Sequence, residues 1–96
     1  MSEHLSTITE LPVDRILMED RLRGVNRAAV EAIKVSIQQG GLLQNITVRR
    51  KRGGDYLIDG AHRLTAAREL GLATIPVKLM RCNDDEARLL EIYANL

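Results

Sequence analysis

The segment YLIDGAHRLTAARELG, from Tyr56 to Gly71, constrains the fold more than any other part of the chain. Its first residues favour a β-strand, and after a single glycine Leu64, Ala67 and Leu70 recur at helical spacing. A strand that turns directly into a helix leaves the first backbone N–H groups of that helix without acceptors inside it. The segment therefore predicts a strand, a junction at Gly60 that can cradle an anion, and a helix stopped by the closing glycine.

The rest of the chain predicts a β-α-β-β-α-β-α order. Between the first strand and the first helix we expect a polar loop that contains Glu19 and Asp20. Pro12 removes a ladder donor and fits a sheet edge or strand end. The expected elements are a strand over 7–11, a helix from the candidate N-cap Asn26 to Gly40 and Gly41, strands over 46–48 and 56–58 around a turn at 51–55, the helix after Gly60, a strand over 75–79, and a last helix opened by a capping box of Asn83 and Glu86.

Length and composition limit the chain to one domain. Ninety-six residues, 45% of them hydrophobic, can bury one core but not two. The alternation of strands and helices, with no repeat or linker, predicts a single compact α+β domain over residues 1–96, with a small mixed sheet and three helices.

Several functional classes are disfavoured by the same numbers. The net charge is +1, so any anion site must be local rather than part of a molecule-wide basic field. Only two residues are aromatic, which leaves little for a single-strand nucleic-acid platform. The lone Cys82 and two histidines give no disulfide and no zinc spacing. With no apolar leader or membrane span visible, we expect a soluble, cytoplasmic protein that does not enter membranes.

His62 and Arg63 occupy the first turn of the helix that follows Gly60. The helix dipole makes that end effectively positive, so two groups able to carry positive charge are unfavourable there unless an anion binds. Arg63 can chelate a phosphate with two parallel hydrogen bonds, and His62 can donate one or act as an acid or base. We expect a phosphate site at residues 60–63. The alternative is that Arg63 pairs with Asp59 or Glu69 and that His62 is merely solvated.

Other candidate residues have two readings each. Asp59 either caps the following helix or holds Mg²⁺ beside the phosphates, with capping the expected role. The basic run of residues 49–52 is a solvated turn or a contact for DNA phosphates. Glu19 and Asp20 are solvated loop carboxylates or supply a catalytic base. Cys82 fits a packing residue better than a nucleophile.

Two segments resemble the ParB family and its ParB/sulfiredoxin superfamily relatives. SIQQGGLLQNITVRR, residues 36–50, resembles the family's "GLLQPI-V-R" box, and residues 56–71 stand where partition ParB proteins carry "GERR-RA" and other members "DGHHR" or "GCHR". The resemblance covers nearly the whole chain and implies a nucleotide-binding fold. It implies a phosphate and nucleotide site formed by Gly41, Gln44, Asp59, Gly60, Ala61, His62 and Arg63.

The chain also departs from those patterns. Ala61 stands where sulfiredoxins have their reactive cysteine, so the sulfinic acid reductase activity lacks its nucleophile. Ala61 and His62 replace the glutamate and first arginine of Gly-Glu-Arg-Arg, which leaves the choice between CTP and ATP open. Asn45 replaces the common proline of the first box. The terminal EIYANL resembles the "ENL-R" metal box but keeps only Asn95, a weakened Mg²⁺ ligand.

Four functions fit the resemblance. The first is a CTP- or ATP-dependent self-association switch in a DNA partition or plasmid-maintenance protein, associated with the nucleoid or a plasmid, acting as a homodimer and contacting DNA through regions beyond this chain. The second is a small-molecule kinase of the free-serine-kinase type, with Glu19 or Asp20 as base. The third is a ParB-like nuclease, although no carboxylate cluster is visible. The fourth is an interaction domain that has lost its ligand. Whether a bound nucleoside triphosphate is hydrolysed stays open.

Overall fold

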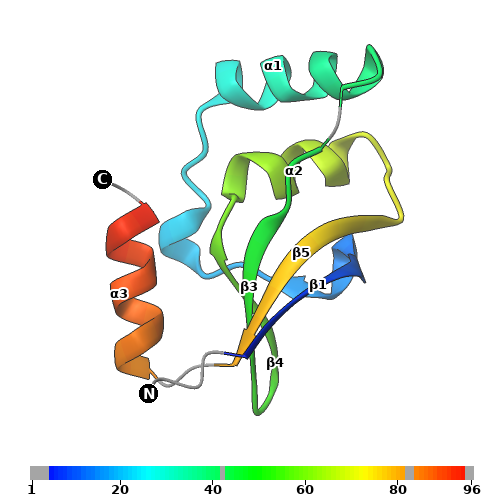
Figure 1. Cartoon of the computed structure of the whole chain (residues 1–96). Helices are drawn as coiled ribbons and strands as arrows, with labels where there is room; N and C mark the ends of the chain where they lie inside the picture. Colours follow the sequence, from blue (N-terminus) through cyan, green and yellow to red (C-terminus); the bar gives the residue numbers. More distant parts are fainter. Residues whose placement is uncertain (1–4, 42, 82–83, 95–96) are drawn as a thin grey trace.

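The computed structural model describes residues 5–41, 43–81 and 84–94. The sequence-based prediction of one α+β domain with a small mixed sheet and three helices is confirmed (Figure 1). No helix in the described part of the chain is both long and apolar enough to cross a membrane. The elements are strand β1 (Leu5–Pro12), 3-10 turn η1 (Val13–Arg15), strand β2 (Ile16–Leu17), 3-10 turn η2 (Asp20–Leu22), helix α1 (Arg27–Gln38), strands β3 (Ile46–Lys51) and β4 (Gly54–Asp59), helix α2 (Ala61–Glu69), strand β5 (Thr74–Arg81) and helix α3 (Asp84–Ala94).

The five strands form one sheet in the order β1-β5-β3-β4-β2. β1 pairs antiparallel with β5, β5 lies parallel to β3, β3 and β4 form an antiparallel hairpin, and β4 lies parallel to β2. Pro12 is the last residue of β1, which is an edge strand. This agrees with its missing amide donor and with the prediction from the sequence.

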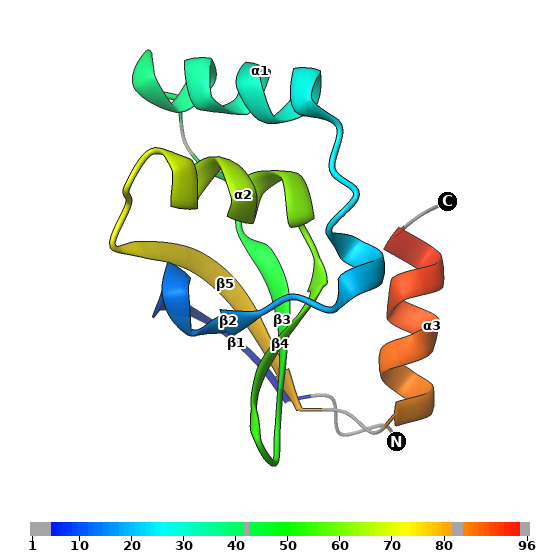
Figure 2. The same cartoon turned by 180° about the vertical axis from the view of Figure 1, so that it is seen from behind.

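The helices form two layers over one face of the sheet. Figures 1 and 2 show α2 lying on the sheet and α1 lying over α2, on the side away from the sheet. The two helices run alongside each other in the same direction, and α3 stands to one side. The start of α2 therefore lies beneath the start of α1, which brings the segment before α1 next to the junction at Gly60.

The core lies between α2 and the sheet. Alternate residues of β3 and β5 point toward α2, because side chains along a strand alternate between its two faces. Each fully buried Leu, Ile or Val contributes about 1.5–3 kcal/mol relative to its exposed state. The residues at this interface with no more than 2% exposure are Ile16, Ile46, Val48, Leu57, Leu64, Ala67, Ile75 and Val77.

Helices α1 and α2 end in the same way, as the glycines in the sequence predict. Gly40 and Gly71 have φ angles of +86° and +73°, in the left-handed region that glycine adopts without steric cost. Gly41 N–H then donates to Ser36 O at 2.8 Å, and Leu72 N–H donates to Ala67 O at 3.0 Å. These six-to-one hydrogen bonds are the Schellman motif, which satisfies carbonyls at the helix end.

The segment between β1 and α1 was expected to be a loop, and that prediction is wrong in part. It contains η1, the two-residue strand β2 and η2. A strand of two residues has no periodic pattern to recognise, and its geometry comes from tertiary contacts. Arg68 of α2 donates from Nε and Nη2 to Val13 O, at 3.1 and 3.0 Å, and from Nη2 to Ile16 O at 2.5 Å. One guanidinium thus fixes both ends of η1.

A buried carboxylate fixes the hairpin to the same segment. Asp55 is 2% exposed and accepts two hydrogen bonds from Arg50, Nε to Oδ1 at 2.9 Å and Nη2 to Oδ2 at 3.2 Å. Arg15 Nε lies 3.4 Å from Oδ2. The hydrogen bonds from Arg50 hold the pKa of Asp55 below its usual range despite burial. The basic run at the hairpin is therefore partly structural, because Arg50 is committed to this pair.

The remaining boundaries differ slightly from those predicted. The hairpin turn is only Arg52 and Gly53, since Lys51 pairs with Gly54 across the strands. The proposed capping box depends on Asn83, which lies outside the described residues, as does Cys82. The α3 helix is present, and Leu89, Ile92 and Tyr93 on it are 54%, 52% and 70% exposed.

Candidate anion-binding site at the start of helix α2

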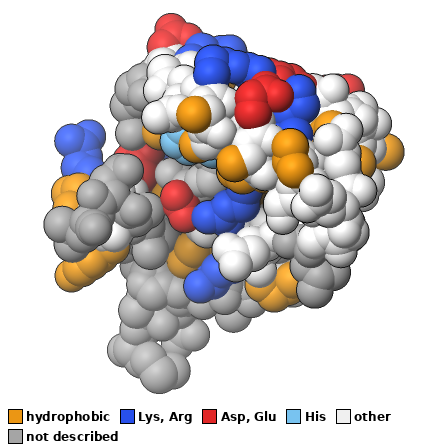
Figure 3. All heavy atoms as spheres, turned by 90° about the horizontal axis from the view of Figure 1, so that it is seen from above, with side chains coloured by type: hydrophobic (Ala, Val, Ile, Leu, Met, Phe, Trp, Pro, Cys, Tyr) orange, Lys and Arg blue, Asp and Glu red, His pale blue; other side chains and the backbone are white. Residues whose placement is uncertain are grey.

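A cavity of about 260 Å³ lies at the start of α2. Two segments far apart in the sequence form its walls: the β4–α2 junction, and the connection between η2 and α1. Figure 3 shows the molecule from above, with basic and acidic side chains interspersed on this face. The face is therefore neither uniformly positive nor uniformly negative. The lining residues are Leu22, Gly24, Val25, Ile58, Asp59, Gly60, Ala61, His62 and Arg63.

The backbone of this junction leaves amide donors unused by the helix. Gly60 is the N-cap of α2, with φ 109° and ψ 31°, and no side chain caps the helix. The Leu64 N–H donates to Gly60 O at 2.9 Å, the first hydrogen bond of the helix. The N–H groups of Ala61, His62 and Arg63 precede it and have no acceptor within α2. A helix start of this kind, with no acidic residue in its first turn, is suited to binding an anion.

Packing gives a second physical reason why residue 60 is a glycine. A Cβ built on Gly60 would lie 2.4 Å from Cγ2 and 2.8 Å from Cβ of Ile46, a residue with no solvent exposure. The missing side chain would thus collide with the core, and the positive φ independently favours glycine. Packing alone is sufficient to explain this glycine, so the phosphate assignment rests on the amides and side chains around it.

Arg63 is half-buried and has no carboxylate partner among the described residues. Its Nη1 donates to the backbone carbonyl of Asn45 at 2.5 Å. The alternative of an internal ion pair with Asp59 or Glu69 is wrong, because Glu69 binds Arg27 and Lys34 instead. One hydrogen bond to a carbonyl orients this guanidinium at the cavity wall without neutralising its charge.

His62 is also half-buried and is not merely solvated. Its Nε2 accepts a hydrogen bond from the backbone N–H of Asn26 at 3.0 Å. An imidazole nitrogen that accepts carries no proton, so in this arrangement the ring is neutral with its proton on Nδ1. His62 thus acts here as a hydrogen-bond acceptor, and Arg63 is the cationic group at this helix start.

Asp59 lines the cavity but does not cap the helix. The N-cap is Gly60, and no side chain caps α2, so the expected capping role is wrong. The physical reason is the left-handed backbone at Gly60, which moves the cap one residue beyond the aspartate. Among the lining residues that the structure describes, Asp59 is the acidic side chain. Within the described residues, no group of three His, Cys, Asp or Glu side chains is placed to hold a metal ion by itself.

Among the described residues, Gly41, Gln44, Glu19 and Asp20 do not line this cavity. Gly41 closes the end of α1, and a Cβ there would lie 2.6 Å from Ser36 Oγ. Gln44 is exposed. The side chain of Asp20 is fully exposed and pairs with Arg23 at 3.1 Å, while Glu19 precedes η2. Asn95 lies outside the described residues.

Sequence reasoning missed the wall formed by Leu22, Gly24 and Val25. Two apolar residues and a glycine in a polar connection carry no recognisable motif. The one available signal was Asn26, predicted as an N-cap and confirmed, because its Oδ1 accepts from Ala29 N–H at 3.2 Å. An N-cap fixes where the helix begins and therefore where the preceding residues must lie.

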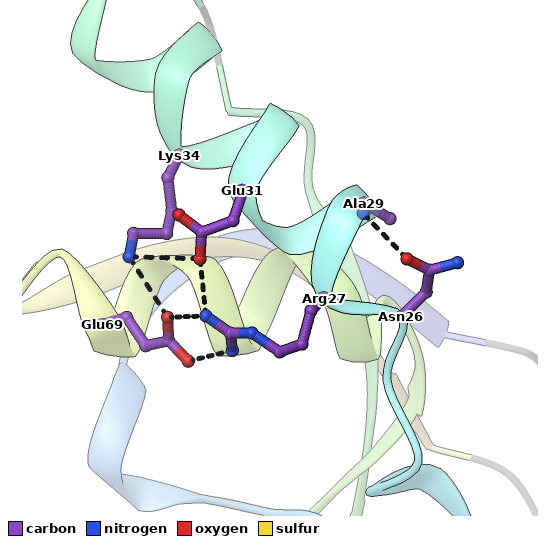
Figure 4. A network of polar contacts seen from close by, with 6 residues as sticks. All are labelled: Asn26, Arg27, Ala29, Glu31, Lys34 and Glu69. Carbon is purple, nitrogen blue, oxygen red and sulfur yellow. Dashed lines mark hydrogen bonds and ion pairs between the residues drawn. The ribbon is translucent and has the colours of Figure 1, made fainter.

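A charge network holds α1 against α2 (Figure 4). Arg27 donates to Glu69 from Nη1 at 2.6 Å and Nη2 at 2.9 Å, and to Glu31 at 2.5 Å. Lys34 Nζ lies 3.2 Å from Glu69. Hydrogen bonds from Arg27 and then Lys34 lower the pKa of Glu69 to about 2, and the carboxylates raise the pKa of Arg27. The network joins α2 to α1, the helix that follows the Leu22–Val25 wall of the cavity.

Comparison with known proteins identifies the family of this fold. The model of the ParB N-terminal domain family matches residues 1–96. The chain belongs to that family. This ParB N-terminal domain is 35% identical over 92 residues to the probable plasmid-partitioning protein ParB of Thermus thermophilus, covering 93% of the chain and 30% of that protein. It thus spans less than a third of the length of this relative.

Solved structures agree with the family. Sulfiredoxin from Arabidopsis thaliana superposes on this ParB N-terminal domain with a TM-score of 0.75 at 33% identity, covering 88% of the chain and 96% of that structure. C-terminally truncated ParB from Caulobacter crescentus complexed with CTP-gamma-S gives a TM-score of 0.80 at 24% identity, covering 94% and 53%. The same protein is also solved complexed to the centromeric parS site, with a TM-score of 0.74. The resemblance read from the two sequence boxes is confirmed.

Proposed function

We propose that this domain binds a nucleoside triphosphate, CTP or ATP, with its phosphates at the start of α2, and that it acts as a nucleotide-dependent self-association switch in a DNA partition or plasmid-maintenance protein. The observation that carries the proposal is the cavity at residues 58–63. There, first-turn amides without helical acceptors meet Arg63, which has no carboxylate partner within the described residues.

The geometry suits a phosphate chain better than an apolar ligand. Amide N–H groups and a guanidinium are the donors that phosphate oxygens bind most strongly. A volume of about 260 Å³ lies just below the roughly 300–1,000 Å³ typical of ligand pockets. It can enclose phosphates and part of a nucleoside, so the remainder of the nucleotide extends over the Leu22–Val25 wall.

The proposal includes a magnesium ion beside the phosphate chain. Mg²⁺ is commonly held by one or two carboxylates together with substrate phosphates and water. Asp59 is the acidic residue at the cavity, and we assign it as the protein ligand for that ion. The ion would screen the carboxylate from the phosphates, which otherwise repel each other.

Two structures of a relative support this function. The Caulobacter ParB structure carries CTP-gamma-S, and its parS complex contains DNA. The Caulobacter ParB chain is longer than this one, which covers 53% and 46% of it in the two structures, and we assign contact with DNA to regions outside this chain. The exposed apolar side chains of Leu89, Ile92 and Tyr93 on α3 provide a surface on which copies of the domain can associate.

The kinase alternative has weaker support. A base for phosphoryl transfer must reach the substrate hydroxyl next to the phosphates. Neither Glu19 nor Asp20 lines the cavity, and the Asp20 side chain is exposed and paired with Arg23. We therefore favour nucleotide binding over transfer to free serine.

Calorimetric titration with CTP and ATP, each with Mg²⁺, tests the site directly. Arg63→Ala should weaken binding by about 1.5–3 kcal/mol, the usual value of hydrogen bonds to charged groups. Arg52→Ala is the matched control, because Arg52 is an exposed arginine in the hairpin turn. Equal affinity in wild type and Arg63→Ala would contradict the assignment. Light scattering with and without nucleotide tests the switch, and labelled phosphoserine formed from free serine would instead establish the kinase.

A further inference from the structure

We propose that His62 is a positioning residue that holds the Gly24–Val25 wall over the phosphate site through the backbone of Asn26. This inference deepens the proposed function and rests on it. His62 is the second helical residue of α2 and lines the cavity. Its role differs from that of Arg63, which we assign to the phosphates.

The contact between His62 and Asn26 joins two elements that are distant in the sequence. The imidazole Nε2 accepts from Asn26 N–H at 3.0 Å. The other polar groups of Asn26 serve α1: Oδ1 accepts from Ala29 N–H at 3.2 Å, and the carbonyl accepts from Val30 N–H at 3.1 Å. His62 therefore supplies the acceptor for the one backbone donor of Asn26 that the helix cannot use.

The wall of the cavity lies immediately before this contact. Val25 N–H donates to Arg23 O at 2.9 Å, and Arg23 N–H donates to Asp20 O at 3.0 Å. Local hydrogen bonds thus fix the wall on its η2 side, and the His62 contact fixes it on its α1 side. A Cβ built on Gly24 would meet nothing within 4 Å, so the space on that side of Gly24 is open.

The acceptor role dictates the state of the ring. Nε2 can accept only when it carries no proton, so the proton resides on Nδ1 and the ring is neutral. A neutral ring lets Asn26 stay in place, while Arg63 keeps the positive charge of the site. A wall held before the ligand arrives lowers the ordering cost of binding.

Two variants separate positioning from a simple structural effect. Glutamine carries an amide oxygen at about the reach of Nε2 and retains an acceptor, whereas alanine retains none. Without nucleotide, we expect His62→Ala to speed hydrogen exchange of the Asn26 amide by about tenfold, the effect of losing one hydrogen bond of roughly 1–1.5 kcal/mol. His62→Gln should stay within about threefold of wild type, and Arg63→Ala should leave this amide unchanged. Unchanged Asn26 exchange in His62→Ala would overturn the contact.

Nitrogen chemical shifts of the imidazole give an independent test in wild type. We expect the tautomer with its proton on Nδ1, and a proton on Nε2 would overturn the proposal. With Mg²⁺ and CTP or ATP, His62→Ala should raise Kd by about tenfold and His62→Gln by less than about threefold. Faster Asn26 exchange with wild-type affinity in His62→Ala would overturn positioning while leaving the Arg63 site intact. Failure of wild type to bind either nucleotide would overturn the proposed function itself, and the exchange experiment would still report on the contact.

Discussion

Substitution of Gly60 by alanine should destabilise the domain by about 2–5 kcal/mol. The backbone at this residue has a φ of +109°, and a left-handed conformation costs an L-residue about 1–2 kcal/mol. The added Cβ would also lie 2.4 Å from Cγ2 of Ile46, and overpacking of a tight core costs about 1–3 kcal/mol. Each kcal/mol lowers the melting temperature of a domain of this size by about 4–8 °C. The midpoint should therefore fall by roughly 10 °C or more.

Thermal and urea unfolding of matched variants provides the measurement. Gly71→Ala is the control, because Gly71 also has a positive φ, +73°, but a Cβ there meets nothing within 4 Å. It should lose only the conformational part, about 1–2 kcal/mol. Ile46→Ala combined with Gly60→Ala should be destabilised by less than the sum of the single changes, because Ile46 Cγ2 is gone. Equal losses for Gly60→Ala and Gly71→Ala would refute the packing argument, and the positive φ alone would then account for the loss at Gly60.

Three further predictions concern charge and structure. In a pH titration followed by NMR, the carboxyl of Glu69 should have a midpoint near pH 2. Because the pKa of Glu69 is lowered from 4.5, the stability that this carboxylate contributes is fully present above about pH 4.5 and is lost as the pH falls toward 2. Arg68→Ala should lower the free energy of unfolding in urea by about 2–4 kcal/mol, because the carbonyls of Val13 and Ile16 lose their donors. Arg68→Lys should restore less than half of that free energy, because an ammonium lacks the two-pronged donor geometry of a guanidinium. In gel-shift assays the isolated domain should bind duplex DNA weakly or not at all, given its net charge of +1; tight, sequence-selective binding would contradict this.

The regular elements were predictable where local pattern and tertiary structure agree. The apolar spacing of α2, the alternation in β5 and the glycines that end α1 and α2 all lie where the sequence places them. The strand β2 was not predictable, because two residues carry no period and their geometry depends on Arg68 and Asp55. Tertiary contacts therefore determine the structure of the segment between β1 and α1, which the local sequence pattern predicted to be a loop.

The candidate site was predictable on one side only. The motif at residues 59–63 identifies the helix start and its charge, since both are local properties of the sequence. The opposite wall, with Leu22 and Val25, depends on how α1 is laid over α2. Arg27 and Glu69 join the two helices, and they look like ordinary surface charges until the helices are placed in space.

The pairing of β1 with β5 sets the order in which this domain can fold. Leu5 lies opposite Arg81 and Pro12 opposite Thr74, so the first strand pairs with the last. A ribosome releases β1 long before β5 exists, and contacts this distant in sequence form slowly. Until synthesis has passed Arg81, β1 has no neighbour in the sheet, and its unpaired edge is exposed to aggregation during that interval. Nascent chains cut before β5 should therefore depend on chaperones, whereas those extended past Arg81 should not.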